Sequence, residues 1–168
     1  IEEPARRTPI PAEWYAPDFV GALLADEARW RRHFPGYRAR EGQIQLARAL
    51  LIALREDRVV GAEAGTGIGK TLAYGLVGLL HALHTGERVI VSSANRTLQE
   101  RVVEEELPRI AAVLGLPRQP ALVLKGRANY GCAARATELA EHPDDFGFGA
   151  MPAAARLYLT SYFARCPE

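Results

Sequence analysis

Three glycines fall within five positions and are followed by lysine and threonine in the stretch Ala64-Gly65-Thr66-Gly67-Ile68-Gly69-Lys70-Thr71. Glycine permits positive φ angles and lets main-chain N–H groups come close to a ligand, because no Cβ obstructs the approach. An apolar run at 58–63 precedes the stretch, and leucines at helical spacing follow it. A glycine-rich loop between a strand and a helix N-terminus is typical of phosphate binding. The stretch therefore predicts a nucleoside triphosphate site in an α/β fold.

Each position of this stretch has a chemical reason. Lys70 would supply a mobile positive charge to the β- and γ-phosphates, and the Thr71 hydroxyl would be a ligand of Mg²⁺. Lys70 and Thr71 are therefore the candidate catalytic residues. Ala64 stands where the usual pattern has glycine, a small change that we interpret as a variant. The candidate nucleotide-binding residues of the loop are Ala64, Gly65, Thr66, Gly67, Ile68, Gly69, Lys70 and Thr71. The alternative is a glycine-rich turn that binds nothing.

Composition and charge bear on three other classes of protein: nucleic-acid-binding, membrane and disulfide-rich. The chain has 168 residues, of which 48% are hydrophobic and 24% charged, enough for a domain with a real core. A net charge of +1 gives no global argument for nucleic acid, so any such surface must be local. No apolar run approaches the roughly 20 residues of a membrane span, so no membrane partner is expected. Two cysteines make no disulfide framework, and we expect a cytoplasmic protein with reduced thiols.

Hydrophobic periodicity predicts alternating helices and strands. Helices are expected from an N-cap at Asp18 to about residue 34, over 40–55, after the phosphate loop, and over 95–106, with a break at Pro108. Buried strands are expected at 58–63, 88–92 and 121–124. This alternation predicts a parallel sheet flanked by helices. The carboxyl ends of its strands would bring together Ala64, Ser93 and Lys125.

The character of the chain changes after Cys132, where short helices are expected at 133–141 and 153–163. The predicted organisation is a lead-in and helix over 1–34, an incomplete nucleotide-binding domain over 35–131, and the start of an inserted helical domain over 132–168.

Three further stretches accompany the phosphate loop. They read Tyr37-Arg38-Ala39-Arg40-Glu41-Gly42-Gln43, Ser92-Ser93-Ala94-Asn95-Arg96-Thr97-Leu98-Gln99-Glu100 and Lys125-Gly126-Arg127-Ala128-Asn129-Tyr130-Gly131-Cys132. Together the four stretches cover about residues 34–132 and resemble the DinG/XPD-type DNA helicases of superfamily 2. The resemblance implies a P-loop NTPase domain of the RecA-like α/β class. It also implies an ATP-dependent helicase working 5′→3′ on single-stranded DNA or on duplexes with a single-stranded tail.

The resemblance assigns nucleotide and nucleic-acid roles to residues of these three stretches. Tyr37, Arg40 and Gln43 would recognise adenine, since a glutamine amide both donates and accepts a hydrogen bond. The alternative for Gln43 is a solvated residue near a helix start. The candidate nucleic-acid residues are Ser93, Asn95, Arg96, Gln99, Arg127, Asn129 and Tyr130. Around Ser93 and Asn95 a plain N-cap is the alternative, and both roles are compatible.

In relatives the third stretch ends in the first cysteine ligand of a [4Fe–4S] cluster, and Cys132 fits that place. Cys166 would be the second ligand, but a cubane cluster takes four thiolates and this chain has two. No complete cluster is therefore expected within these residues. The alternative is a pair of unrelated reduced cysteines in a lineage without the cluster.

Hydrolysis of ATP needs an acidic pair after a hydrophobic strand, and the one Asp pair, Asp144-Asp145, does not follow such a strand. The resemblance therefore implies that this chain is the ATP-binding N-terminal part of helicase domain 1, inactive alone, whose partners include the remainder of a longer chain with the second motor domain. Two alternatives are a regulatory or adaptor module that binds nucleotide without hydrolysis, and a CRISPR-associated DinG-like helicase that lacks the cluster.

Overall fold

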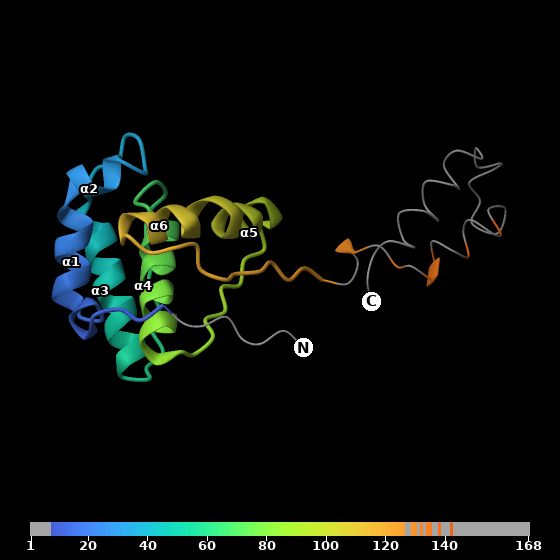
Figure 1. Cartoon of the computed structure of the whole chain (residues 1–168), viewed down its shortest axis with the longest axis horizontal. Coiled ribbons are helices and arrows are strands. Elements are labelled where there is room, and N and C mark those ends of the chain that lie inside the picture. Colours follow the sequence, from blue (N-terminus) through green and yellow to red (C-terminus); the bar gives the residue numbers. More distant parts are fainter. Residues whose placement is uncertain are drawn as a thin grey trace. The chain divides into compact units, whose positions relative to one another are not determined.

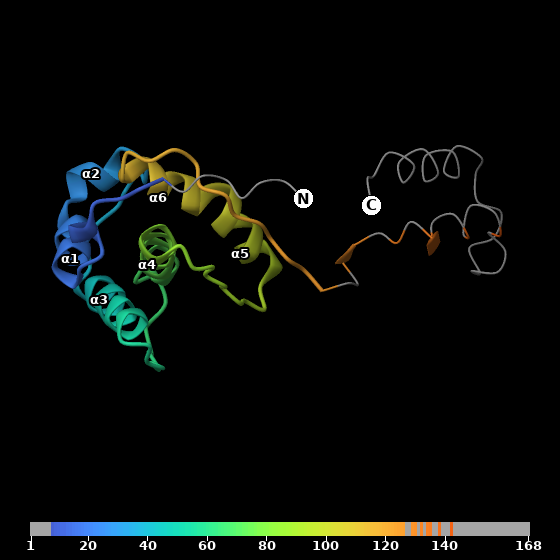
Figure 2. The same cartoon turned by 60° about the horizontal axis from the view of Figure 1, so that its bottom comes forward.

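The computed structural model describes residues 8–126 together with residues 129, 130, 132, 134, 135, 138 and 142. The chain divides into two compact units, residues 1–123 and 124–168, which are described separately. The helical elements of the first unit are η1 (Ala12–Trp14), α1 (Pro17–Ala25), α2 (Glu27–Arg31), α3 (Glu41–Arg55), α4 (Lys70–Thr85), α5 (Arg96–Arg101), η2 (Val102–Glu106) and α6 (Leu107–Val113). Figures 1 and 2 show these helices from two directions.

The first unit is organised around α4. Helix α1 packs on α3, α3 packs on α4, and α4 packs on α6 (Figures 1 and 2). Nearly every residue from Leu72 to His81 is buried, as expected for a helix with apolar residues on all sides. Gly75 lies where α6 approaches, and a Cβ there would be 3.1 Å from Ile110 Cδ1. The small residue therefore permits a close helix–helix contact.

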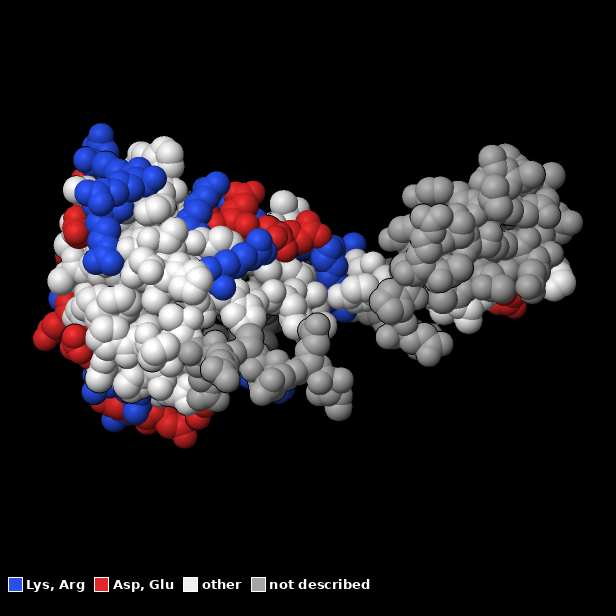
Figure 3. Space-filling view, viewed as in Figure 1, with Lys and Arg blue, Asp and Glu red and all other residues white. Residues whose placement is uncertain are grey.

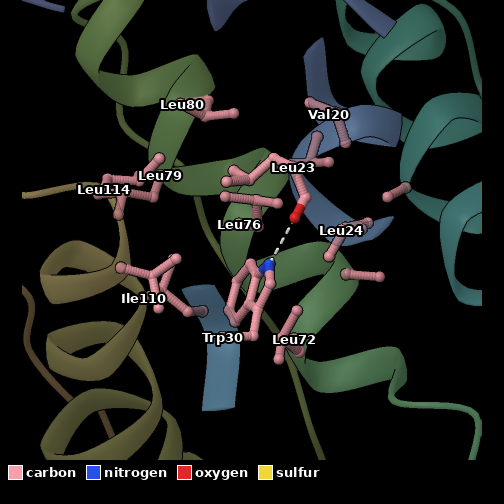
Figure 4. Packing of buried hydrophobic residues seen from close by; sticks show 14 of the residues in the cluster. Val20, Leu23, Leu24, Trp30, Leu72, Leu76, Leu79, Leu80, Ile110 and Leu114 are labelled. Atoms are coloured by element: carbon pink, nitrogen blue, oxygen red, sulfur yellow. Dashed lines mark hydrogen bonds between the residues drawn. The ribbon is translucent and has the colours of Figure 1, made fainter. Parts of the chain in front are cut away.

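The core joins the helices through large side chains (Figure 4). Trp30 is fully buried, and its indole Nε1 donates a hydrogen bond to the Leu23 carbonyl at 2.7 Å. This bond satisfies the one polar group that a buried tryptophan brings into a core. The other side chains labelled around it are Val20, Leu24, Leu72, Leu76, Leu79, Leu80, Ile110 and Leu114.

The helix predicted from Asp18 to about residue 34 is in fact two helices. Helix α1 ends and α2 begins at Asp26, whose carboxylate accepts a hydrogen bond from the Arg29 N–H at 3.1 Å. The predicted N-cap at Asp18 is also wrong, since α1 starts at Pro17 after the extended residue Ala16. Proline suits the first helical position because its missing N–H would have no partner there.

The break predicted at Pro108 is wrong as well. Helical structure continues from α5 through η2 into α6. The turn η2 is a π-helix in which the Leu107 N–H donates to the Val102 carbonyl, five residues earlier. Proline clashes with the carbonyl four residues before it in a regular α-helix. The wider π turn accommodates Pro108 without ending the helix.

The predicted parallel sheet is absent, because no residue in the described part of the chain forms a strand. The segments 58–63, 88–92 and 121–124 are neither helix nor strand, and they expose large side chains such as Val59, Ile90 and Leu122. An apolar run can favour a strand, but a strand also needs a hydrogen-bonded neighbour and, in parallel sheets, cover on both faces. The predicted α/β class is therefore corrected to an all-helical arrangement of the described residues.

Candidate nucleotide-binding site

The glycine-rich stretch forms an exposed loop that leads directly into α4. Gly67 and Gly69 have φ angles of 80° and 86°, in the left-handed region that favours glycine. Gly69 is the N-cap of α4, and no side chain caps this helix end. The first N–H groups of a helix lack partners within the helix and carry a partial positive charge. The loop and the helix end can therefore receive an anion.

Lys70 is the first residue of α4 and folds back over the loop. Its ammonium Nζ donates hydrogen bonds to the carbonyl oxygens of Ala64 at 2.7 Å and Gly65 at 3.0 Å. These contacts hold a positive charge at the loop, and the side chain remains exposed. Thr71 is the second residue of the same helix and is partly buried.

Gln43 connects α3 to the loop. Its amide Nε2 donates a hydrogen bond to the Gly69 carbonyl at 3.0 Å, and the side chain is 1% exposed. A Cβ at position 69 would lie 2.2 Å from that nitrogen, so the contact requires glycine there. Gln43 and Gly69 are 26 residues apart in the sequence, so two stretches predicted to form one nucleotide site are in direct contact.

Tyr37 supports Gln43 from the core side. Its hydroxyl lies 2.7 Å from the Leu24 carbonyl and 3.1 Å from Gln43 Oε1, and these two acceptors share its single hydrogen. Its ring stacks on Trp30 with centroids 5.2 Å apart. Burial, together with the Glu27 charge, raises the pKa of Tyr37 to about 12. Tyr37 is therefore a neutral phenol that orients Gln43.

Arg40, the third residue predicted to recognise adenine, is exposed at the N-cap position of α3 and makes no side-chain cap there. The alternative that Gln43 is a solvated residue is wrong, because its side chain is buried between Tyr37 and Gly69.

In the predicted DNA-contacting stretch after residue 92, the polar side chains form hydrogen bonds within the stretch itself. Asn95 caps α5, with its Oδ1 accepting from the Leu98 N–H at 3.1 Å, so the N-cap interpretation is confirmed. Ser93 Oγ accepts from the Asn95 N–H at 3.2 Å, and Gln99 Nε2 donates to the Ser93 carbonyl. Arg96 is exposed. DNA contact by this stretch stays a prediction.

The second unit holds the remaining predicted residues. Tyr130 and Asn129 are exposed; the Tyr130 hydroxyl accepts from the Lys125 N–H at 2.8 Å, and Asn129 Nδ2 donates to the Gly126 carbonyl at 3.0 Å. Cys132 is exposed with a free thiol. Arg127 and Cys166 lie outside the described residues, as does most of the two helices predicted after Cys132. Where the structure is described, no three histidine, cysteine or acidic residues gather as metal ligands.

A second polar cluster lies at the far end of α4 and had no sequence signal. The Tyr15 hydroxyl is 2.6 Å from His81 Nδ1, and His81 Nε2 is 3.0 Å from Glu87 Oε2. The Tyr15 ring also stacks on His84, with centroids 4.4 Å apart. Tyr15 and His81 are separated by 66 positions, so no local pattern could have paired them.

Comparison with known proteins adds a relationship at the level of sequence. The ATP-dependent DNA helicase YoaA of Escherichia coli K12 is 37% identical over 112 residues, which cover 67% of this chain and 17% of YoaA. The ATP-dependent helicase DinG of Mycobacterium tuberculosis H37Rv is 40% identical over 96 residues, covering 55% of this chain and 14% of that protein. The chain is homologous to the YoaA and DinG helicases.

A further relative is named 3′-5′ exonuclease DinG, from Bacillus subtilis, and is 31% identical over 111 residues, or 66% of this chain and 12% of that protein. The chain thus spans less than a fifth of the length of these curated relatives. No family model matches the chain, and no solved structure matches it. Within the described residues, no helix has both the length and the apolar character needed to cross a membrane.

Proposed function

We propose that residues 64–71 bind the triphosphate of ATP and that this chain is the ATP-binding part of a DinG-type DNA helicase. The observation that carries the proposal is the hydrogen bond from Gln43 to the Gly69 carbonyl, which joins the two stretches expected to hold the adenine and the phosphates. The homology to proteins named ATP-dependent helicases supports ATP as the ligand.

Binding would exchange existing contacts for stronger ones. The Lys70 ammonium would leave the carbonyls of Ala64 and Gly65 for phosphate oxygens. An ammonium and a phosphate carry opposite charges, so their contact adds a Coulomb attraction that the neutral carbonyls do not provide. The first N–H groups of α4, which no side chain caps, would add to this attraction. Thr71 would hold the Mg²⁺ that accompanies the nucleotide.

Turnover requires groups beyond these residues. A second motor domain and an acidic pair that positions Mg²⁺ and water would come from the remainder of the longer protein. We propose 5′→3′ movement along single-stranded DNA for that protein. Cys132 and Cys166 would be two of the four thiolates that a [4Fe–4S] cluster takes, and the other two would come from the remainder of the longer protein. The chain alone should bind nucleotide without DNA-stimulated hydrolysis.

Replacing the loop lysine tests the site. Lys70→Ala should weaken ATP binding by about tenfold or more, because an interaction with a charged group contributes about 1.5–3 kcal/mol. Lys125→Ala is the matched control, since it removes the other lysine of the chain and leaves the loop intact. Isothermal titration calorimetry with ATP measures both. Equal affinity in the two variants would refute the phosphate-loop assignment.

Gln43→Ala separates two roles of the glutamine. If Gln43 recognises adenine, as we propose, its buried amide exchanges its contacts with Tyr37 and Gly69 for the base, and the variant should lose most of its preference for ATP over GTP. If the side chain only holds Gly69 in place, ATP and GTP affinities should fall by the same factor. Competition between the two nucleotides for a fluorescent ATP analogue gives this ratio directly, and an unchanged ratio would rule out the adenine role.

A further inference from the structure

A concentration of arginine lies on the connection between α2 and α3. We name residues 31–40 the arginine loop; its arginines are Arg31, Arg32, Arg38 and Arg40. The loop contains no acidic residue, and the carboxylate that contacts it is Glu27, which forms an ion pair with Arg31. Arg32, Arg38 and Arg40 are exposed.

The loop is fixed to the helices beneath it. Arg31 Nε donates to the Tyr37 carbonyl at 3.0 Å, and the Ala39 N–H donates to the Glu27 carboxylate at 2.9 Å. The stacking of Tyr37 on Trp30 attaches the middle of the loop to the core. The exposed guanidinium groups therefore extend from a backbone whose shape is already set, which lowers the entropy lost when they bind a partner.

Three arginines on or near η2 and α6 differ from these, because each of the three has an acidic partner. The ion pairs are Arg101 with Glu106 at 3.1 Å, Arg109 with Glu105 at 3.7 Å and Arg118 with Glu104 at 2.8 Å. Figure 3 shows blue and red side by side over α5 and α6, and mostly blue over α2 and the arginine loop. In the part of the chain that the structure describes, Arg32, Arg38 and Arg40 form no ion pair.

We propose that the arginine loop binds the phosphodiester backbone of DNA through Arg32 and Arg38, two exposed residues that are not among those proposed to hold the nucleotide or among residues 93–99. A guanidinium presents a planar fork of donors that matches phosphate oxygens. Such contacts position a strand without reading its bases, so the binding is independent of sequence. The surface itself indicates a polyanion, and the choice of DNA rests on the proposed function.

The test compares two double variants of equal charge in the full chain. Arg32→Ala/Arg38→Ala removes two unpaired arginines of the loop, and Arg58→Ala/Arg118→Ala removes two arginines that pair with Glu56 and Glu104 outside the loop. Fluorescence anisotropy of a labelled single-stranded oligonucleotide is measured over a salt series. The loop variant should bind several-fold more weakly at low salt, and its slope of log K against log salt should shrink by about 1.4, or about 0.7 per phosphate contact. The matched control should keep the parental slope.

Three outcomes would overturn the proposal: no binding of the oligonucleotide by the parental chain, equal losses in the two double variants, or displacement of DNA by polyglutamate at equal charge concentration. The last would identify an acidic protein surface as the partner. ATP titration of the same variants separates this inference from the proposed function. Loss of DNA binding with intact ATP binding supports the arginine loop, whereas failure of ATP binding in the parental chain refutes the proposed function and not the DNA result.

Discussion

At each end of α4 a buried tyrosine contacts a second polar side chain. That side chain contacts a main-chain carbonyl at one end and a carboxylate at the other. At the N-terminal end, Tyr37 contacts the Gln43 amide, and Gln43 donates to the main-chain carbonyl of Gly69. These contacts therefore end on the main chain of the glycine-rich loop. Gln43 therefore fixes the loop from the protein side, while Gly65, Thr66, Gly67 and Lys70 remain exposed.

At the C-terminal end, Tyr15 contacts the His81 imidazole, and His81 contacts the Glu87 carboxylate. Both nitrogens of the His81 ring therefore have a side-chain partner. The outer partner, Glu87, has a side chain that is 71% exposed. Gly86 ends the helix with a φ of 78°, and its N–H donates to the Ala82 carbonyl. These contacts attach the segment before α1 to α4.

We interpret the N-terminal end of α4 as preorganised for a ligand and the C-terminal end as an attachment point for the segment before α1. An N-terminal helix end that lacks a side-chain cap keeps its N–H groups available for an anion, and a fixed loop lowers the cost of binding. At the other end the polar groups are already partnered by side chains and a main-chain bond. Equal backbone changes at the two ends should therefore have unequal effects on nucleotide binding.

The largest expected effect comes from a matched pair of glycine substitutions. Gly69→Ala and Gly86→Ala both place a side chain at a left-handed residue of α4, which costs about 1–2 kcal/mol. Gly69→Ala should lower the free energy of unfolding further, to a total of about 2–4 kcal/mol, because its Cβ would meet Gln43 Nε2 at 2.2 Å. Chemical denaturation measures the stability, and ATP titration should show a loss for Gly69→Ala alone.

A double variant identifies the cause of that difference. Gln43→Ala combined with Gly69→Ala removes the group that the new Cβ would meet, so the two changes together should cost less than the sum of the single changes. The same Gln43→Ala change combined with Gly86→Ala should be additive, since no contact joins these positions. Additivity in both pairs would show that the loop does not depend on Gln43.

The parts of the site that were predictable from the sequence have local signals. Apolar spacing predicted a helix over 40–55, and α3 spans Glu41–Arg55. The left-handed φ angles of Gly67 and Gly69 follow from the same glycines that indicated the loop. The cap at Asn95 also has a local signal, because short polar side chains satisfy helix N-termini within three residues.

The parts that failed depend on partners distant in the chain. Apolar runs such as 88–92 predicted strands, but pairing depends on a neighbour that the run does not encode, and Ile90 is 90% exposed. Pro108 predicted a break because the rule assumes α-helical geometry, which the π turn before it avoids. The contact between Gln43 and Gly69 depends on the packing of α3 against α4, which no single motif specifies.

The smallest expected effect concerns the two tyrosines. Burial raises the pKa of Tyr37 from 10.0 to about 12, and burial also raises the pKa of Tyr15. Because the folded state keeps the phenol protonated, the stability from Tyr37 is fully present below pH 10 and is lost as the pH rises toward about 12. The loss at about pH 11 should be near 1 kcal/mol. Urea denaturation at several alkaline pH values should show this slope in the parent, and Tyr37→Phe should flatten it more than Tyr15→Phe. An unchanged slope in Tyr37→Phe would mean that this hydroxyl is open to solvent and does not orient Gln43.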